Sequence, residues 1–339
     1  MLPGTGIPFR RLLVRSLRSV DADIHAVLDP VRLALSVPQA TALLAWRRPA
    51  AIFTTGGYVA LPVLLAASVL RIPVVMWDGN VVPGRSVRAT ARLAGSLAVT
   101  FESTCAALGG RKRPCYVTGT PIRDPRSVNR IDARKALGVE ADERLLLIFG
   151  GSQSVRRFNA AVAEALPRLV ERVRVIHVTG DAGYDEAVAG RDALPEELRG
   201  RYRPERFLDE QMTLALAAAD LVVGRAGSST LAEVAAFGLP MVVVPYPHAA
   251  GHQRRNAAEM VRSGAARLVE DGDFDAEALL AAAAILDDDK THDEMAAAAH
   301  ALARPGAADA VAELVMAAAE RRPLPAPARL EAMSRGVAV

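Results

Sequence analysis

Short apolar runs alternate with helix-forming stretches along almost the whole of this 339-residue chain. Parallel strands need a long crossover connection, usually a helix, so this alternation is typical of parallel β-sheets covered by helices. The first series of expected strands covers residues 50–54, 72–77, 97–101 and 116–118. The second series covers residues 145–149, 173–178, 219–223 and 241–244, with an edge strand at 266–269. The pattern therefore predicts an α/β fold with two parallel sheets.

Two domains fit this length, because each half of the chain is large enough to bury its own core. Residues 119–129 contain two prolines and several turn-forming residues, which favours a linker between the two series. We expect a first domain over 1–124, a second domain over 125–310, and a C-terminal helix and tail over 311–339. The first series starts at what reads as a late strand, so the first domain is expected to be incomplete at its N-terminus.

The composition argues against disulfide, metal and membrane-spanning classes. Cys105 and Cys115 stand ten residues apart without a CxxC or Cys/His cluster, so we expect neither a disulfide framework nor a zinc site. The six histidines show no metal-binding spacing, and we expect no metal and no cofactor. The longest apolar stretch, 59–70, has twelve residues, well short of the roughly twenty that span a bilayer. We expect no secretory signal and take a reducing cytoplasm as the default compartment.

Charge is divided unevenly along the chain. Residues 1–125 hold 15 Lys/Arg against 6 Asp/Glu, whereas the whole chain carries a net charge of only +3. A basic first half fits an anionic membrane surface or nucleic acid. Because the aromatic and basic residues are not interleaved as in proteins that stack bases, we expect a membrane surface and no nucleic acid. Scattered, solvated arginines are the alternative.

Residues 224–257 carry the strongest functional signal in the sequence. They read as a strand end, a small-residue turn, a helix, an apolar strand, and a polar loop that opens a second helix. Gly227 and Ser228 stand where the turn becomes a helix, and a helix N-terminus offers N–H groups and a positive dipole end to a phosphate. Glu233 lies one turn further, on the face that carries Ser229, where its carboxylate could accept from sugar hydroxyls.

The polar loop after the apolar strand adds short-range hydrogen-bonding side chains, namely His248, His252, Gln253 and Asn256. Partners for a phosphate, a diol and a polyol thus gather within about thirty residues, as a nucleotide-sugar pocket requires. The alternative is a helix start that is rich in Gly and Ser only for capping, followed by an ordinary amphipathic helix.

A second glycine turn, GGSQS at 150–154, follows the expected strand 145–149 and opens a helix. It is neither a GxGxxG nor a Walker A motif, and a tight turn without a ligand is the alternative. Ligands of open α/β sheets bind beyond the carboxyl ends of the strands. The turns at 150, 207–209, 224–230 and 245–253 should therefore cluster on one rim.

Two turns of the first series also follow strands, at 54–58 and 77–80, and should line the opposite wall of a cleft. Two facing sites suit a group-transfer reaction, with the donor on one side and the acceptor on the other. For Tyr58 and Trp77, a role as core aromatics is an equally good interpretation.

These motifs resemble those of the MurG family of N-acetylglucosaminyltransferases, over about residues 4–321. TGGYVALP is similar to the family's GGYVSGP loop, GTPIR to GNPVR, GGSQS to GGSQG, RAGSSTLAEVAAFGLP to RSGALTVSEIAAAGLP, and HAAGHQRRNA to a loop ending HQxxNA. The resemblance implies the GT-B fold, in which two Rossmann-like domains face each other across a cleft. It also implies metal-independent, inverting transfer of N-acetylglucosamine from UDP-N-acetylglucosamine. The implied acceptor is lipid I, an undecaprenyl-pyrophosphoryl-muramyl-pentapeptide, and the product is lipid II for peptidoglycan synthesis.

Carried over position by position, the resemblance implies a donor site in the second domain. Glu233 would hold the ribose hydroxyls, the backbone of Leu208 would meet the uracil edge, and Arg123 would lie near the nucleotide. The diphosphate would lie at the turn residues Gly227, Ser228, Ser229 and Thr230, with Ser152 nearby. His252 and Gln253 would contact the sugar.

The implied acceptor side lies in the first domain and comprises Gly56, Gly57, Tyr58 and Asn80. The family's HEQN motif is WDGN here, and its GGSQG ends in Ser154. Its N-terminal GGTGGH turn, whose histidine is the family's favoured general base, has no counterpart, and we expect about two βα units to precede the recorded start. The general base is therefore unassigned, with Asp78 as a candidate substitute.

Three functions stay open at this point. The first is the transferase just described, in cell-wall biogenesis and thereby in cell shape and division, peripheral on the cytoplasmic side of the cell membrane. The second is a glycosyltransferase for another membrane lipid. The third is a non-catalytic nucleotide-sugar-binding protein or subunit, because the N-terminal turn is missing.

Overall fold

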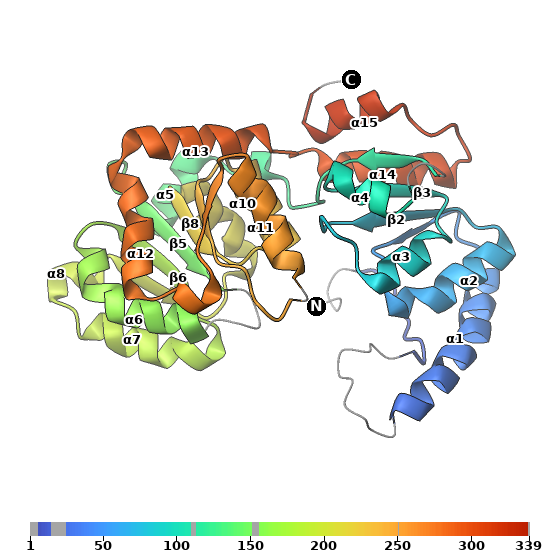
Figure 1. Cartoon of the computed structure of the whole chain (residues 1–339), viewed down its shortest axis with the longest axis horizontal. Coiled ribbons are helices and arrows are strands. Elements are labelled where there is room, and N and C mark those ends of the chain that lie inside the picture. The colour runs from blue at the N-terminus through green and yellow to red at the C-terminus, as the bar shows by residue number, and fades with distance from the viewer. Residues whose placement is uncertain (1–5, 15–24, 110–112, 151–155, 250, 338–339) are drawn as a thin grey trace. The chain divides into compact units, whose positions relative to one another are not determined.

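The computed structural model describes residues 6–14, 25–109, 113–150, 156–249 and 251–337 (Figure 1). The chain divides into two compact units. The first unit combines the residues up to Gly119 with Asp309–Met333, and the second spans Thr120–Ala308 with a short C-terminal piece. Each unit is built on one parallel sheet with helices on both faces, which confirms the expected α/β class.

The sheet of the first unit has the strand order β1-β2-β3-β4, and all neighbouring strands pair in parallel. Its strands are β1 (Ile52–Thr54), β2 (Val74–Asp78), β3 (Ser96–Val99) and β4 (Cys115–Val117). The helices packed on it are α1 (His25–Arg47), α2 (Leu61–Leu70), α3 (Arg85–Ala91), α4 (Glu102–Ala107), α14 (Ala307–Ala319) and α15 (Pro327–Ser334).

Both faces of this sheet are covered, because successive side chains of a strand point to opposite sides. Val74 and Met76 pack in one cluster with residues of α1 and α2. Val75, between them in sequence, packs in another cluster with Leu314 of α14 and Leu330 of α15. A strand buried on both faces must be apolar throughout, which is why β2 reads as a continuous hydrophobic run.

The second unit has six parallel strands in the order β10-β9-β8-β5-β6-β7. Its strands are β5 (Leu145–Phe149), β6 (Arg174–Val178), β7 (Tyr202–Glu205), β8 (Leu221–Gly224), β9 (Met241–Val243) and β10 (Ala266–Leu268). Its helices are α5 (Arg130–Leu137), α6 (Arg156–Val170), α7 (Tyr184–Asp192), α8 (Glu196–Arg199), α9 (Met212–Ala218), α10 (Ser228–Ala236), α11 (His252–Arg262), α12 (Ala276–Ala283) and α13 (Asp289–Ala301).

The central strand β5 divides the core of the second unit into two layers. Leu146 and Ile148 pack with residues of α6 and α12 on one face. Leu145 and Leu147 pack with residues of α5, α9 and α10 on the other. The apolar clusters on both faces hold the strand ends, and the turns that leave them, in fixed positions.

Every strand expected from the sequence is present, with ends shifted by at most two residues. The strand β7 was not among those expected. It is short, carries Arg203, Pro204 and Glu205, and lies at the edge of the sheet next to β6. Charged residues and proline are typical of edge strands, where one side of the backbone needs no partner strand, and they hide such a strand from a hydrophobicity pattern.

The expectation that the chain forms no disulfide is wrong. Cys105 of α4 and Cys115 of β4 are bonded, with their Cα atoms 5.8 Å apart. The physical reason is topological: α4 runs back along the sheet between two neighbouring parallel strands, β3 and β4. A span of ten residues is therefore enough to bring the chain back beside itself, within the usual Cα distance of a disulfide.

His177 of β6 is a buried, neutral base inside the second unit. Its side chain is 1% exposed, and its Nδ1 lies 2.9 Å from the hydroxyl oxygen of Tyr202. Burial penalises the charged imidazolium and lowers the pKa of His177 to about 3. Between that value and about 6.5, the unfolded chain binds a proton at this residue that the folded protein does not bind.

We expect the free energy of unfolding to fall as the pH is lowered from about 6.5 towards 4.5, with a contribution from His177 of up to about 1.4 kcal/mol per pH unit. Urea titrations at a series of pH values measure this slope. His177→Gln should flatten it, whereas the exposed His300→Gln should leave it unchanged. Equal slopes for the three proteins would contradict the assignment.

Candidate functional site

The strand order of the second unit reverses direction between β5 and β8. From β5 the chain builds β6 and β7 on one side, then returns to place β8, β9 and β10 on the other. At such a reversal the turns leaving the two central strands diverge, and ligands bind beyond the strand ends. A side chain at Gly224, the end of β8, would put its Cβ only 3.0 Å from the carbonyl oxygen of Phe149 at the end of β5. Because glycine has no Cβ, the backbone at the end of β8 can approach the backbone at the end of β5 closely.

The glycine-rich turn after β5 is only partly described. Gly150 is buried at the end of the strand. Residues 151–155, including Ser152, lie outside the described residues, so the part of Ser152 in phosphate binding stays a prediction. The matching turn after β8 is described in full.

That second turn ends at the N-terminus of α10. Gly227 is the N-cap residue, with φ −66° and ψ 143°, and no side chain among the described residues accepts a hydrogen bond in capping it. Ser228 and Thr230 are half-buried, while Ser229 is exposed. The N–H groups of the first turn of α10 and these small hydroxyl side chains thus lie together at the positive end of the helix dipole. Such an arrangement is suited to a phosphate.

Glu233 lies one turn further along α10 and is held in a partly desolvated position. Burial raises the pKa of Glu233, and the guanidinium of Arg123 acts in the opposite direction. Arg123 Nη1 also donates to the backbone oxygen of Asp209, at 3.2 Å. One arginine therefore connects the carboxylate on α10 with the turn that follows β7.

The turn after β7 has an unusual backbone. Asp209 has a φ of +36°, a left-handed conformation that a residue with a side chain adopts at an energetic cost. Leu208, before it, is 4% exposed, and its carbonyl oxygen accepts from Gln211 N–H at 2.6 Å. The strained backbone lies at the position where the resemblance places the uracil edge, and the contact of Arg123 fixes it.

Gln253, which the resemblance places at the sugar, closes the loop after β9. It lies in the first turn of α11, and its Oε1 accepts from the backbone N–H of Tyr246 at 2.9 Å. Asn256, which is 1% exposed, donates through Nδ2 to the backbone oxygen of Ala226 at 3.5 Å. These contacts bring the α11 residues next to the turn before α10. The contact of His252 and Gln253 with a sugar stays a prediction.

Arg225 was not among the site residues expected from the sequence. This residue links the turn after β8 to the loop after β9 and to Asp271. Its side chain is 5% exposed and donates to the backbone oxygen of Val244 at 3.2 Å and to Asp271 Oδ1 at 2.5 Å. Its guanidinium also lies 4.7 Å from the ring centre of Phe158 and 5.4 Å from that of Tyr246. The signal in the sequence was an arginine directly after a buried strand, a position where a charge needs a partner.

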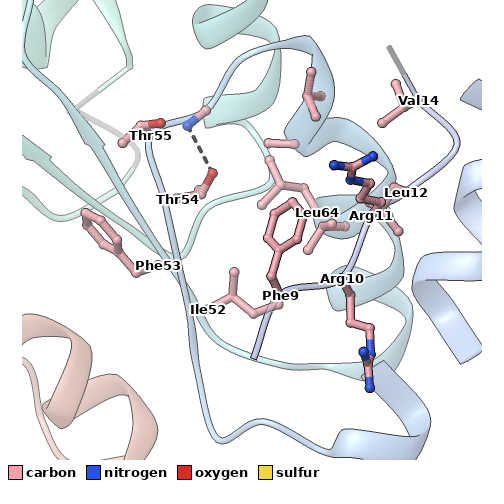
Figure 2. A pocket seen from close by; sticks show the side chains of 14 residues that line it. Phe9, Arg10, Arg11, Leu12, Val14, Ile52, Phe53, Thr54, Thr55 and Leu64 are labelled. Atoms are coloured by element: carbon pink, nitrogen blue, oxygen red, sulfur yellow. Dashed lines mark hydrogen bonds between the residues drawn. The ribbon is translucent and has the colours of Figure 1, made fainter. Parts of the chain in front are cut away.

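The acceptor-side residues form a separate group in the first unit. Gly56 and Gly57 have φ values of +71° and +90°, which glycine adopts freely. The hydroxyl of Thr54 accepts from Gly56 N–H at 3.0 Å, as the dashed line in Figure 2 shows. A Cβ at Gly56 would lie 3.3 Å from the side chains of Met76 and Thr90. Tyr58, half-buried, begins the short 3-10 helix that follows.

Asp78 and Asn80 lie together at the end of β2. The side chain of Asp78 is 5% exposed, and its Oδ1 accepts from the backbone N–H of Asn80 at 3.3 Å and from its side-chain Nδ2 at 3.2 Å. Asp78 thus shapes the turn that presents Asn80. Trp77 packs against the apolar cluster on the α14 face and donates to the backbone oxygen of Gly119, which favours the core alternative for this aromatic.

Among the described residues, no three His, Cys, Asp or Glu side chains gather as a metal ion would require. The arrangement supplies instead a helix N-terminus, hydroxyls, one half-buried carboxylate and one guanidinium in the second unit. Groups of these kinds can bind a phosphorylated diol through hydrogen bonds and charge.

Comparisons with known proteins identify the family of the chain. Residues 145–314 match the glycosyltransferase family 28 C-terminal domain, and residues 2–99 match the family 28 N-terminal domain. A protein of Desulforudis audaxviator, named UDP-N-acetylglucosamine--N-acetylmuramyl-(pentapeptide) pyrophosphoryl-undecaprenol N-acetylglucosamine transferase, is 35% identical over 93% of this chain and 86% of its own length. A protein of the same name from Cutibacterium acnes is 37% identical over 89% of this chain and 81% of its own length.

The crystal structure of Acinetobacter baumannii MurG is similar to this structure, with a TM-score of 0.67 and 30% identity. The match covers 85% of this chain and 79% of that one. The two parallel-sheet units are therefore those of the GT-B fold. This chain belongs to glycosyltransferase family 28 and, within it, to the MurG family.

Proposed function

We propose that this protein transfers N-acetylglucosamine from UDP-N-acetylglucosamine to lipid I and so forms lipid II for peptidoglycan synthesis. It is a hexosyltransferase of the N-acetylglucosaminyl type. The observation that carries the proposal is the arrangement around Arg123, which acts on Glu233 near the start of α10 and donates to the turn after β7. The family's named activity supplies the donor and the acceptor.

The second unit binds the donor through groups that suit each part of a UDP-sugar. The N-terminus of α10 receives the diphosphate, and Glu233 accepts from the ribose hydroxyls. The backbone at Leu208 meets the uracil edge, and His252 and Gln253 contact the sugar. The positive charge of Arg123 favours the carboxylate form of Glu233 and lowers its pKa, against the larger effect of burial, which raises it.

The reaction inverts the anomeric carbon in one displacement. A hydroxyl oxygen of the acceptor forms the new bond to that carbon while the bond to the UDP oxygen breaks. Negative charge then grows on the leaving diphosphate, where the N–H groups and dipole of α10 stabilise it. A base must take the proton of the attacking hydroxyl. Asp78 is our candidate, although its contacts with Asn80 also suit a role in shaping the acceptor side.

Two other functions are separated from this one by experiment. A glycosyltransferase for another membrane lipid would turn over UDP-N-acetylglucosamine with that lipid and not with a lipid I analogue. A non-catalytic binding protein would bind the donor and release no UDP with any acceptor. Radiolabelled transfer assays with a lipid I analogue and with other membrane lipids, together with a measurement of donor binding, decide between the three.

We further propose a peripheral position on the cytoplasmic side of the cell membrane, with a consequent role in cell shape and division. No helix in the described part of the chain is both long and apolar enough to cross a bilayer. The first unit exposes apolar side chains beside arginines: Trp46 is 68% exposed, and the guanidinium of Arg47 lies 4.3 Å from its ring centre. Aromatic and cationic groups together suit the interface of an anionic bilayer.

An apolar groove of about 630 Å³ adds to this surface, between β1, α2 and residues 9–14 (Figure 2). Phe9 projects into it, and Arg10 and Arg11 stand on the same segment. Both arginines are exposed. The groove therefore combines apolar lining with a cationic rim, as an acyl chain and its phosphate would require.

Glu233→Ala should weaken the binding of UDP-N-acetylglucosamine by roughly 1.5–3 kcal/mol, because a hydrogen bond to a charged group is lost. Isothermal titration calorimetry measures the change. Glu277→Ala, which removes an exposed glutamate of α12 in the same unit, is the control and should bind as the wild type does. Equal affinities for all three proteins would remove Glu233 from the site.

Arg123→Gln should raise the pKa of Glu233 further above its ordinary value, because the cation that favours the carboxylate is gone. A pH titration followed by the carboxyl ¹³C signal of Glu233 reports the value directly. Arg126→Gln, three residues away and paired with Asp124, should leave the signal unchanged. A fall in the pKa, or an equal shift in both variants, would refute the electrostatic link.

Arg47→Glu should weaken binding to vesicles that contain phosphatidylglycerol by at least about fivefold, since each basic residue near the surface contributes about 1 kcal/mol. Sedimentation with vesicles measures the bound fraction. The second unit offers a matched control, because Arg206 lies 4.3 Å from the ring centre of Tyr184 in the same kind of pair. If Arg206→Glu weakens binding as much, the first unit is not the membrane-facing part.

A further inference from the structure

The turn that carries Asn80 is held from a second side by a buried threonine. Thr104 lies in the first turn of α4 and is 0% exposed. Its hydroxyl donates to the backbone oxygen of Asn80 at 2.8 Å and lies 3.3 Å from that of Val81. A buried hydroxyl bonded to the backbone of another segment fixes that segment, because breaking the contact leaves buried polar groups without partners.

Asp78 and Thr104 therefore form hydrogen bonds with different atoms of Asn80. The carboxylate of Asp78 accepts from the backbone N–H and the side-chain amide of Asn80. The hydroxyl of Thr104 donates to the carbonyl oxygen of the same residue. The side chain and both backbone groups of Asn80 are thus held by two neighbours, one at the end of β2 and one on α4.

The position of Thr104 depends in turn on how α4 is anchored. The helix has only six residues, too few to be stable without tertiary contacts. The next residue after Thr104 is Cys105, which is bonded to Cys115 on β4. Because β4 pairs with β3 through Cys115 and Leu97, the disulfide fastens α4 to the sheet. Both cysteines are half-buried.

We propose that Thr104 is a positioning residue for Asn80 and that the Cys105–Cys115 disulfide holds Thr104 in place, so that the acceptor side responds to thiol reduction. This inference rests on the proposed function, which puts Asn80 on the acceptor side. Reduction needs a dithiol as co-reactant. One of its thiolates attacks a sulfur of the disulfide, a mixed disulfide forms, and the second thiolate releases the protein thiol. Two electrons and two protons pass to the cysteines, and the dithiol becomes a disulfide.

The first test follows hydrogen exchange in the whole protein, without substrates. Amides of residues 78–82 and 102–107 should exchange at least about threefold faster after treatment with dithiothreitol, while those of 224–236 keep their rates. The Cys105→Ser/Cys115→Ser protein should show the fast rates with and without dithiothreitol. Unchanged exchange at 78–82 on reduction would overturn the proposal, whatever the activity of the enzyme.

The second test measures transfer kinetics with a lipid I analogue. Thr104→Val keeps the shape and removes the hydroxyl, and it should raise KM for the acceptor about tenfold while KM for UDP-N-acetylglucosamine stays within twofold. Thr104→Ser restores the hydroxyl and should recover the wild-type values. Thr118→Val, another buried threonine of the same unit, is the control and should behave as the wild type does.

The outcomes separate the two proposals. One contrary outcome is that Thr104→Val exchanges faster at residues 78–82 but has the same KM for the acceptor as the wild type. This result would show that the turn does not take part in acceptor binding, and it would overturn the inference. Failure of the wild-type protein to transfer sugar to any acceptor would overturn the proposed function instead. The exchange experiment would still decide whether Thr104 and the disulfide hold the turn.

Discussion

The parallel pairing of β5 with β8 is the constraint on which the proposed donor site depends. It runs from Leu146 opposite Leu221 to Phe149 opposite Gly224 and joins the two halves of a sheet that the chain builds outward in opposite directions. The turns that follow the two strands therefore start at neighbouring strand ends and then diverge. One of them ends at the N-terminus of α10, where Gly227 is the N-cap residue. The apolar layers on both faces hold the sheet rigid, so that small groups at its rim keep their places.

Charge at this rim is balanced by contacts between turns. Arg123 acts on Glu233 and holds the strained backbone at Asp209, and Arg225 links the end of β8 to the loop after β9. Each arginine thus neutralises or orients one group and fastens a neighbouring segment. In the first unit, contacts between side chains and a turn also hold a residue in place, but no cation takes part in them: Asp78 and Thr104 both bond to Asn80. The neighbours that hold Asn80 in the first unit are buried, whereas Arg123 beside Glu233 in the second unit is exposed.

The sequence was sufficient for the sheets and for the order of the turns, because buried parallel strands such as β5 are continuous apolar runs. It was insufficient for β7, whose proline and charges suit an edge strand. The cysteine pair could not be foreseen, since its closeness follows from the return of α4 between β3 and β4 rather than from a motif. The same holds for Asn256: its side chain reads as a ligand group, yet it is buried and bonded to the backbone of Ala226.

The far face of the first sheet is covered by α14 and α15, which belong to the last part of the chain. During synthesis on a ribosome, the first four strands emerge early, while Val75, Ala98 and Tyr116 still face water. The apolar clusters of the second unit lie entirely before residue 309, so this unit can complete its core before residues 309–333 exist. The unit that is made first is therefore the later one to mature, and a nascent chain would have to keep one apolar sheet face from aggregating until residues 309–333 are released.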